Sequence, residues 1–130
     1  MHFMSDQLGE HESVLRAIWP NFIKKTGRID PAAFKPRSNK GEIGVSVNRT
    51  RNQSLGDAIA SMRASGYVKP ISGIASITVP ECLLIPVHID PDPPPAVHCQ
   101  IYGDAKLTPI DNVKAFELAK VAQLQSPPQE

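Results

Sequence analysis

The amino-acid sequence predicts an α+β fold with a small, mostly antiparallel sheet flanked by two helices and a proline-rich loop. Short segments alternate apolar and polar residues with the period of a strand, and two longer segments begin with helix N-caps. The expected order is strand, turn, strand, helix, three strands and helix. The 130 residues suit one domain, which we expect to span residues 13–124 between a flexible N-terminus at 1–12 and a flexible tail at 125–130.

The first expected elements are a strand and a helical turn. Residues 14–18 form an apolar run that Pro20 ends, and we interpret the run as a strand, although a helical turn fits it too. Asp30 before Pro31 is typical of an N-cap followed by proline at the first helical position, and this turn is expected to reach Phe34.

The middle of the chain predicts a strand followed by a helix. Residues 42–48 alternate polar and apolar side chains, with Ile43, Val45 and Val47 expected to face inward. Ser54 followed by Asp57 is typical of a helix N-cap, and Gly66 is expected to end the helix. The buried face of this helix is expected to hold Leu55, Ala58, Ile59 and Met62.

Two further segments favour strands. Residues 71–78 are rich in β-branched side chains, and Thr78 with Glu81 predicts a capped helical turn that reaches Cys82. Residues 84–89 are apolar and expected to be extended, at an edge or at the start of a strand because Pro86 interrupts them.

Prolines concentrate in one place. Six of the thirteen prolines lie between residues 80 and 95, and residues 90–95 are expected to form an irregular, polyproline-like loop. We expect this loop to be ordered and to deliver His98 to a fixed position. Residues 96–102 then predict a strand with Val97, Cys99 and Ile101 on one face and His98, Gln100 and Tyr102 on the other.

The last expected element is a helix that reaches about Leu124. Thr108, Pro109 and Asp111 supply an N-cap, a proline at the first position and an acid at the third. The residues expected on its buried face are Ile110, Val113, Phe116, Val121 and Leu124.

Several functional classes find no support in the sequence. It has no P-loop, Rossmann glycine pattern, nucleophile elbow, HExxH motif or EF-hand loop. No apolar run is long enough to span a membrane and no secretory signal is recognisable, so a cytoplasmic location and no membrane partner are expected. Cys82, His88, His98 and Cys99 lack the paired spacing of a zinc site, so we expect neither a metal nor another cofactor.

The net charge of +1 combines a basic segment with acidic flanks. Residues 16–69 contain eleven Lys and Arg against three acidic residues. Such a cluster attracts phosphate, although solvated loop charges are the other interpretation. We predict a non-catalytic binding or adaptor module whose basic segment, 24–51, engages nucleic acid or an acidic protein partner. The candidate anion-binding residues are Lys24, Lys25, Arg28, Lys35, Arg37, Lys40, Arg49 and Arg51.

The alternative is a small nucleotide-acting enzyme that uses Arg16 and His98. Arg16 lies in an apolar stretch and needs an anion or a carbonyl partner if it is buried, and His98 on a strand suits proton transfer. Arg16 and Ser46 on two strands resemble the ADP-ribosyltransferase-like folds, in which such residues cradle a nicotinamide dinucleotide. No matching catalytic glutamate follows Ser46. The hypothesis requires Arg16 and His98 to converge in one cleft.

Short motifs are also spread along most of the chain: Arg16-Ala17-Ile18, Ala33-Phe34-Lys35, Ser46-Val47, Asp90-Pro91-Asp92-Pro93, His98 and Tyr102-Gly103. With them, the segment from about residue 14 to residue 124 resembles a group of short bacterial proteins that have no assigned activity. This resemblance implies a bacterial origin and a single domain, and it assigns no catalytic residue.

Overall fold

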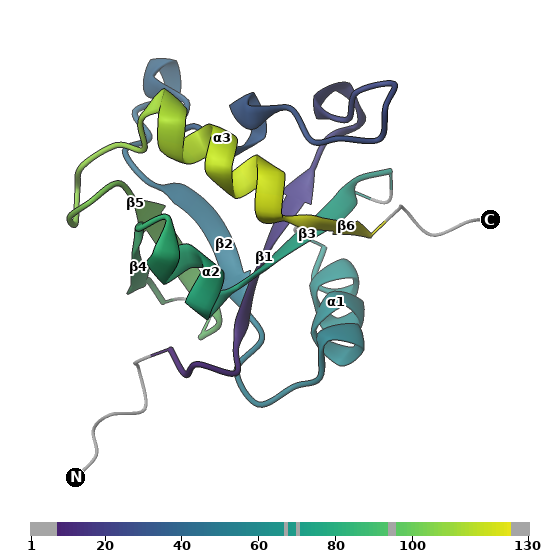
Figure 1. The fold of residues 1–130 in the computed structure, drawn as a ribbon. Coiled ribbons are helices and arrows are strands. Elements are labelled where there is room, and N and C mark those ends of the chain that lie inside the picture. Colours follow the sequence, from purple (N-terminus) through teal and green to yellow (C-terminus); the bar gives the residue numbers. More distant parts are fainter. Residues whose placement is uncertain (1–7, 67, 70, 94–95, 126–130) are drawn as a thin grey trace, which may run out of the picture.

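The computed structural model describes residues 8–66, 68–69, 71–93 and 96–125 (Figure 1). The α+β fold is confirmed: six strands of the described chain form one open antiparallel sheet in the order β4-β5-β2-β1-β3-β6. The strands are β1 Ser13–Ile18, β2 Val45–Arg49, β3 Gly73–Thr78, β4 His88–Pro91, β5 His98–Tyr102 and β6 Gln123–Gln125. The helices are α1 Leu55–Ala64, α2 Val79–Leu84 and α3 Asn112–Val121, with 3₁₀ helices at Pro20–Phe22, Pro31–Phe34 and Ser38–Lys40.

The two faces of the sheet carry separate apolar clusters. Because successive residues of a strand point to opposite faces, Val14 and Ile18 of β1 join the larger cluster with α3, whereas Leu15 joins Met62 of α1 in the smaller one. Phe34 is fully buried in the larger cluster, where the 3₁₀ helix Pro31–Phe34 packs against α3. Helices α1 and α3 therefore cover opposite faces of the sheet (Figure 1).

The predicted strand at 14–18 and three predicted helix caps are confirmed. The carboxylate of Asp30 accepts a backbone N–H two residues later at 2.9 Å, and the Ser54 hydroxyl accepts the Asp57 N–H at 3.2 Å. Thr78 and Glu81 form a complete capping box at the start of α2. These hydrogen bonds need only partners close in sequence, which is why sequence patterns predict them well.

Strand β2 begins at Val45, later than predicted, and Ile43 is 44% exposed rather than inward-facing. The backbone N–H of Arg37 donates to the Glu42 carboxylate at 2.8 Å, so residues 37–42 close as a loop before the strand starts. Val45 and Val47 are buried, as predicted.

Helix α1 follows the prediction with one exception. Ala58 and Met62 are buried, and Gly66 beyond the C-terminus has a φ of 84°, which suits a helix end. Leu55, the first residue of the helix, is exposed because contact with the smaller apolar cluster begins one turn later, at Ala58.

The apolar run at 84–89 is not one extended segment. Helix α2 continues to Leu84, which is exposed, and β4 begins only at His88. Strand β4 includes Asp90 and Pro91, which the sequence analysis placed in an irregular loop. Proline is tolerated there because β4 is an edge strand. Residues 94–95 of the expected loop lie outside the described residues.

Strand β5 confirms the predicted alternation at Cys99 and Ile101, which share a face and are fully buried. The strand begins at His98, later than predicted, and Val97 before it is half-buried. Tyr102 is buried as well, although the alternation places it on the polar face. Its ring lies against Gly44, where a Cβ would come within 2.8 Å of a ring carbon. The missing side chain at Gly44 therefore makes room for the tyrosine.

The last helix differs most from its prediction. Helix α3 starts at Asn112 with Asp111 as its N-cap, because the carbonyl of Thr108 accepts the Gly103 N–H in the preceding turn. Its buried residues are Ala115 and Leu118, whereas Val113 and Phe116 are 71% and 55% exposed. The chain leaves the helix after Val121 because residues 123–125 pair with β3 as strand β6.

Candidate functional site

The sheet is split between its two central strands. Strands β1 and β2 pair only at Val14 with Arg49 and at Leu15 with Asn48. Beyond this point β1 continues along β3, and β2 continues along β5. A pocket of about 440 Å³, here named the β1–β2 pocket, opens where the strands part. Its lining residues are Arg16, Ala17, Trp19, Phe22, Ala33, Arg37, Ser46, Val47, Asn48, Met62, Val68 and His98.

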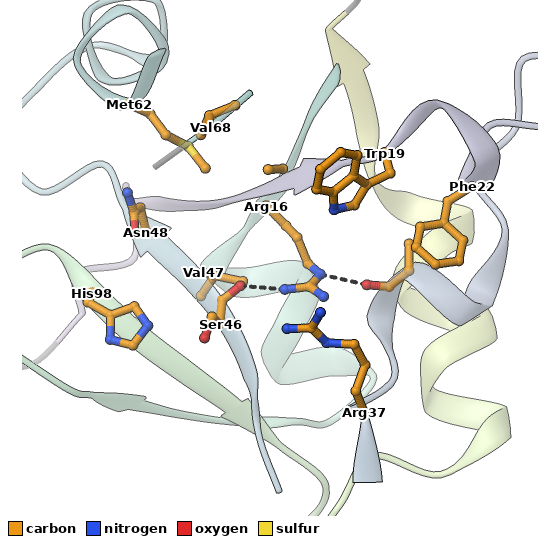
Figure 2. A pocket seen from close by; sticks show the side chains of 12 residues that line it. Arg16, Trp19, Phe22, Arg37, Ser46, Val47, Asn48, Met62, Val68 and His98 are labelled. Atoms are coloured by element: carbon orange, nitrogen blue, oxygen red, sulfur yellow. Dashed lines mark hydrogen bonds between the residues drawn. The ribbon is translucent and has the colours of Figure 1, made fainter. Parts of the chain in front are cut away.

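Arg16 of β1 lies at this split and hydrogen-bonds to the 3₁₀ helix Pro31–Phe34 and to β2 (Figure 2). Its Nε donates to the Ala33 carbonyl at 2.5 Å, and its Nη1 donates to the Ser46 carbonyl at 2.8 Å. Ser46 would face Ala17 if the pairing of β1 and β2 continued, so the guanidinium replaces a missing hydrogen bond of the sheet. The sequence analysis expected an anion or a carbonyl partner for Arg16, and the carbonyls are confirmed.

These two hydrogen bonds use only part of the donor capacity of the Arg16 guanidinium. A guanidinium has five N–H donors, and the two hydrogen bonds of Arg16 within the described chain use two of them. No carboxylate of the described residues lies within ion-pair distance of Arg16. Burial lowers its pKa to about 10, with Glu42 opposing this shift and Arg37 adding to it. Arg16 is therefore still a cation at neutral pH, with donors to spare.

Arg37 places a second guanidinium in the β1–β2 pocket, near that of Arg16 (Figure 2). It is exposed and forms an ion pair with Glu42, with Nη2–Oε2 at 2.5 Å and Nε–Oε2 at 3.1 Å. Arg37 lowers the pKa of Glu42 through this hydrogen bond, and burial of Glu42 opposes the effect. One carboxylate thus faces two arginines at the rim of the pocket.

The polar lining of the pocket comes from β2 and β5. Asn48 pairs with His98 and both line the pocket, whereas Gln100, the β5 partner of Ser46, is not part of the lining. The Nδ1 atom of His98 lies 2.8 Å from the backbone carbonyl of Asp92 and 3.3 Å from its carboxylate. Because a carbonyl only accepts, Nδ1 carries the proton, which leaves Nε2 as an acceptor when the ring is neutral.

Apolar side chains complete the lining. Trp19 and Phe22 lie beside Arg16, whereas Met62 and Val68 lie near Asn48 (Figure 2). Trp19 is 40% exposed, with the ammonium of Lys69 lying 5.1 Å from its ring centroid. The pocket therefore places aromatic rings beside its cations. Met62 was expected on the buried face of its helix, and Trp19, Phe22 and Val68 were not expected in a site, because nothing in the local pattern separates them from core positions.

Arg49, one of the candidate anion-binding residues, is buried at 3% exposure. Its guanidinium contacts the Glu12 carboxylate with Nη2–Oε2 at 2.5 Å and Nε–Oε1 at 2.9 Å. The same carboxylate accepts the backbone N–H groups of Gly9 and Arg51 at 2.8 Å each. Arg49 therefore holds Glu12 inside the fold and faces no surface ligand.

The other candidate basic residues fall into separate groups. Lys24, Lys25 and Arg28 are exposed on one loop, and Lys35 donates to Asn112 of α3. Arg51 donates to the Ala96 carbonyl at 3.3 Å. Lys40 is exposed in the loop before β2, and Arg37 lines the β1–β2 pocket. The basic segment is thus divided among several sites of the molecule.

Both cysteines are buried thiols. Burial, with a smaller contribution from Glu81, raises the pKa of Cys82 to about 12, and burial is also the main cause that raises the pKa of Cys99 to about 11. Neither supplies a thiolate at neutral pH. Within the described ranges, no group of three or more His, Cys, Asp and Glu side chains is arranged to hold a metal ion.

No family model, curated protein or solved structure matches this chain. None of the helices in the described part of the chain has the length and apolar character to cross a bilayer. The candidate site therefore rests on the geometry and chemistry of the β1–β2 pocket. Arg16, Ser46 and His98, which the sequence analysis connected through the enzyme hypothesis, all line the β1–β2 pocket.

Proposed function

We propose that this chain binds a small anionic ligand that carries a planar group, of the nucleotide class, in the β1–β2 pocket. The observation that carries the proposal is Arg16, a half-buried cation with unused donors and no carboxylate within ion-pair distance among the described residues. A buried cation is costly unless an opposite charge balances it. A bound phosphate or carboxylate would supply that charge, and Arg37 would share it.

The shape and chemistry of the pocket support this ligand class. Its volume of about 440 Å³ suits a small molecule, since ligand pockets span roughly 300–1,000 Å³. The anion would bind at Arg16 and Arg37, and a planar ring would pack against Trp19. Ser46, Asn48 and His98 would meet hydroxyl groups on the side of Arg16 away from Trp19. Each part of a nucleotide thus has a counterpart in the lining.

The experiment uses Trp19, which is the only tryptophan of the chain. Its fluorescence would be titrated with AMP, ADP, NAD⁺ and inorganic phosphate, with calorimetry as a second readout. We expect a nucleotide to bind more tightly than phosphate, because only the nucleotide would pack a ring against Trp19 in addition to meeting the arginines. Removing a charge-assisted hydrogen bond costs about 1.5–3 kcal/mol, so Arg37→Ala should weaken binding at least about tenfold.

Lys40→Ala is the control, because it removes an exposed cation of the same basic segment that does not line the β1–β2 pocket. It should leave nucleotide affinity unchanged. If neither fluorescence nor calorimetry detects a nucleotide at millimolar concentration, or if both variants behave alike, the proposal is wrong.

A second candidate is the ADP-ribosyltransferase-like enzyme, favoured by the convergence of Arg16, Ser46 and His98 on one pocket. The described lining contains no Asp or Glu, so binding is the better-supported function. Release of nicotinamide from NAD⁺ by the wild-type protein, lost in His98→Ala, would instead establish the enzyme. In that case His98 Nε2 would accept a proton during turnover.

A further inference from the structure

A second cavity, of about 410 Å³, lies between the loop at 23–29 and the last turns of α3. Lys24 and Arg28 line it from the loop, and Phe116 and Lys120 line it from the helix. The lining in the described structure includes no acidic residue, and none of it is shared with the β1–β2 pocket. We name this surface, together with the nearby Lys35, the α3 groove.

Backbone hydrogen bonds hold the loop of the α3 groove in shape. Ile23 and Ile29 form an antiparallel bridge, and the Lys24 N–H donates to the Arg28 carbonyl at 2.7 Å. Gly27 turns the chain with a φ of 86°, which a side chain would disfavour. Lys24 and Arg28 are therefore fixed near each other at the neck of a small hairpin.

Helix α3 extends the charged surface along one face. Asn112, Phe116 and Lys120 recur every four residues, so they lie in a row that spans about 12 Å of helix. The Lys35 ammonium donates to the Asn112 side chain at the start of the row. Cations therefore stand at both ends of the row, with Phe116, 55% exposed, between them.

The cations of the α3 groove outnumber the acids close to it. Among the described residues, no ion pair involves Lys24, Arg28, Lys35 or Lys120. The acidic neighbours are Glu117 on α3, its N-cap Asp111 and Asp30 beside the loop, and the carboxylates of Asp30 and Asp111 each accept a backbone N–H. The surface thus keeps an excess of positive charge.

We propose that the α3 groove binds single-stranded nucleic acid. Single strands are bound where cations follow the phosphates and an aromatic side chain stacks on a base, and the groove combines both features. An acidic peptide would satisfy the cations, but it would leave the exposed ring of Phe116 without a planar partner. The row on α3 has room for a short stretch of strand, with phosphates at its ends and a base on Phe116.

The test measures fluorescence anisotropy of labelled dT15 and rU15 between 50 and 200 mM NaCl. Each phosphate contact on a single strand contributes about −0.7 to the slope of log K against log salt, so four cations predict a slope of up to about −3. The double variant Lys24→Glu/Arg28→Glu should bind at least about tenfold more weakly and with a flatter slope. Phe116→Ala should bind several-fold more weakly with the slope unchanged, because stacking carries no charge.

Lys40→Glu is the control, because it reverses an exposed charge of the same basic segment outside the α3 groove. It should retain wild-type affinity. Three results would overturn the proposal: no binding of either oligonucleotide at 50 mM NaCl, equal loss in Lys40→Glu and the double variant, or wild-type binding by Phe116→Ala. A poly-glutamate peptide that binds while both oligonucleotides fail would assign the groove to an acidic protein.

Discussion

Arginines in this protein do different work according to where the fold places them. Arg16 bonds to two carbonyls at the split of the sheet, and Arg49 neutralises a buried carboxylate. Arg37 and Arg28 are exposed, one at the pocket and one at the α3 groove. Their residue type is identical, so their environments decide whether each arginine stabilises the fold or faces a ligand.

The buried ion pair between Glu12 and Arg49 leads to a prediction about stability. Removing one partner of such a pair costs about 3–5 kcal/mol, because the other charge stays buried and unpaired. We expect Arg49→Met to lower the free energy of unfolding by that amount in a urea titration. Arg37→Met, which breaks an exposed ion pair, should cost less than about 1 kcal/mol. Equal losses in the two variants would contradict this interpretation of burial.

The buried face of helix α3 is set by the elements packed against it and differs from the face that the apolar pattern predicted. Alternative apolar faces exist on α3, and the molecule buries the one with Ala115 and Leu118. Ala115 is fully buried where α3 packs against the 3₁₀ helix Pro31–Phe34, and its small side chain permits a close approach there. Val113 and Phe116 are left outside.

This orientation of α3 makes opposite predictions for two of its apolar residues. Leu118→Ala should lower the free energy of unfolding by about 2–5 kcal/mol, because it opens a cavity in the core. Phe116→Ala should change it by no more than about 0.5 kcal/mol, since the ring is exposed. Denaturant titrations of both variants provide the measurement. A large loss in Phe116→Ala would mean that the ring is covered in solution.

At the scale of the whole molecule, the sheet is continuous at its edges and open at its centre. The pairs β1 with β3 and β2 with β5 are well formed, while β1 and β2 touch over two register positions. This split creates the β1–β2 pocket in the middle of the sheet. Strands β1 and β2 therefore both contribute residues to the lining of the pocket.

The stability of the whole molecule should fall in acid. Burial raises the pKa of Glu12, but hydrogen bonds from Arg49, Gly9 and Arg51 outweigh it, so the pKa lies below the usual 4.5. A lowered carboxyl pKa contributes stability above the unfolded-state value, and this contribution is lost as pH falls through the folded-state value. We expect the melting temperature to drop below about pH 4.5 in the wild type.

Glu12→Gln is the matched variant for the acid prediction. It should be less stable than the wild type at neutral pH and should lose less on acidification, because it lacks the titrating carboxylate. Melting curves of both proteins between pH 3 and pH 7 make the comparison. Parallel curves across this range would show that Glu12 does not contribute to the pH dependence.

Sequence patterns predicted the parts of this protein that depend on near neighbours. The caps at Asp30, Ser54 and Thr78 and the strand alternation at Cys99 and Ile101 are confirmed, because they follow from hydrogen bonds and side-chain directions within a few residues. The α+β class follows from their order. Strand β6 was missed because its residues are extended only through pairing with the edge of β3, a contact between segments distant in the sequence.

The candidate sites depend on contacts between residues far apart in the chain. The sequence marked Arg16, His98 and the basic segment as functional candidates. Continuing the alternation of Val45 and Val47 by two residues would have placed Arg49 on the buried face, but the predicted strand ended at residue 48. The sequence by itself determined the fold class, three of the four predicted helix caps and most of the strands, since these rest on local geometry. Only the tertiary structure decided where the sheet splits, which face of α3 is buried and which cations meet, since these depend on how distant segments pack.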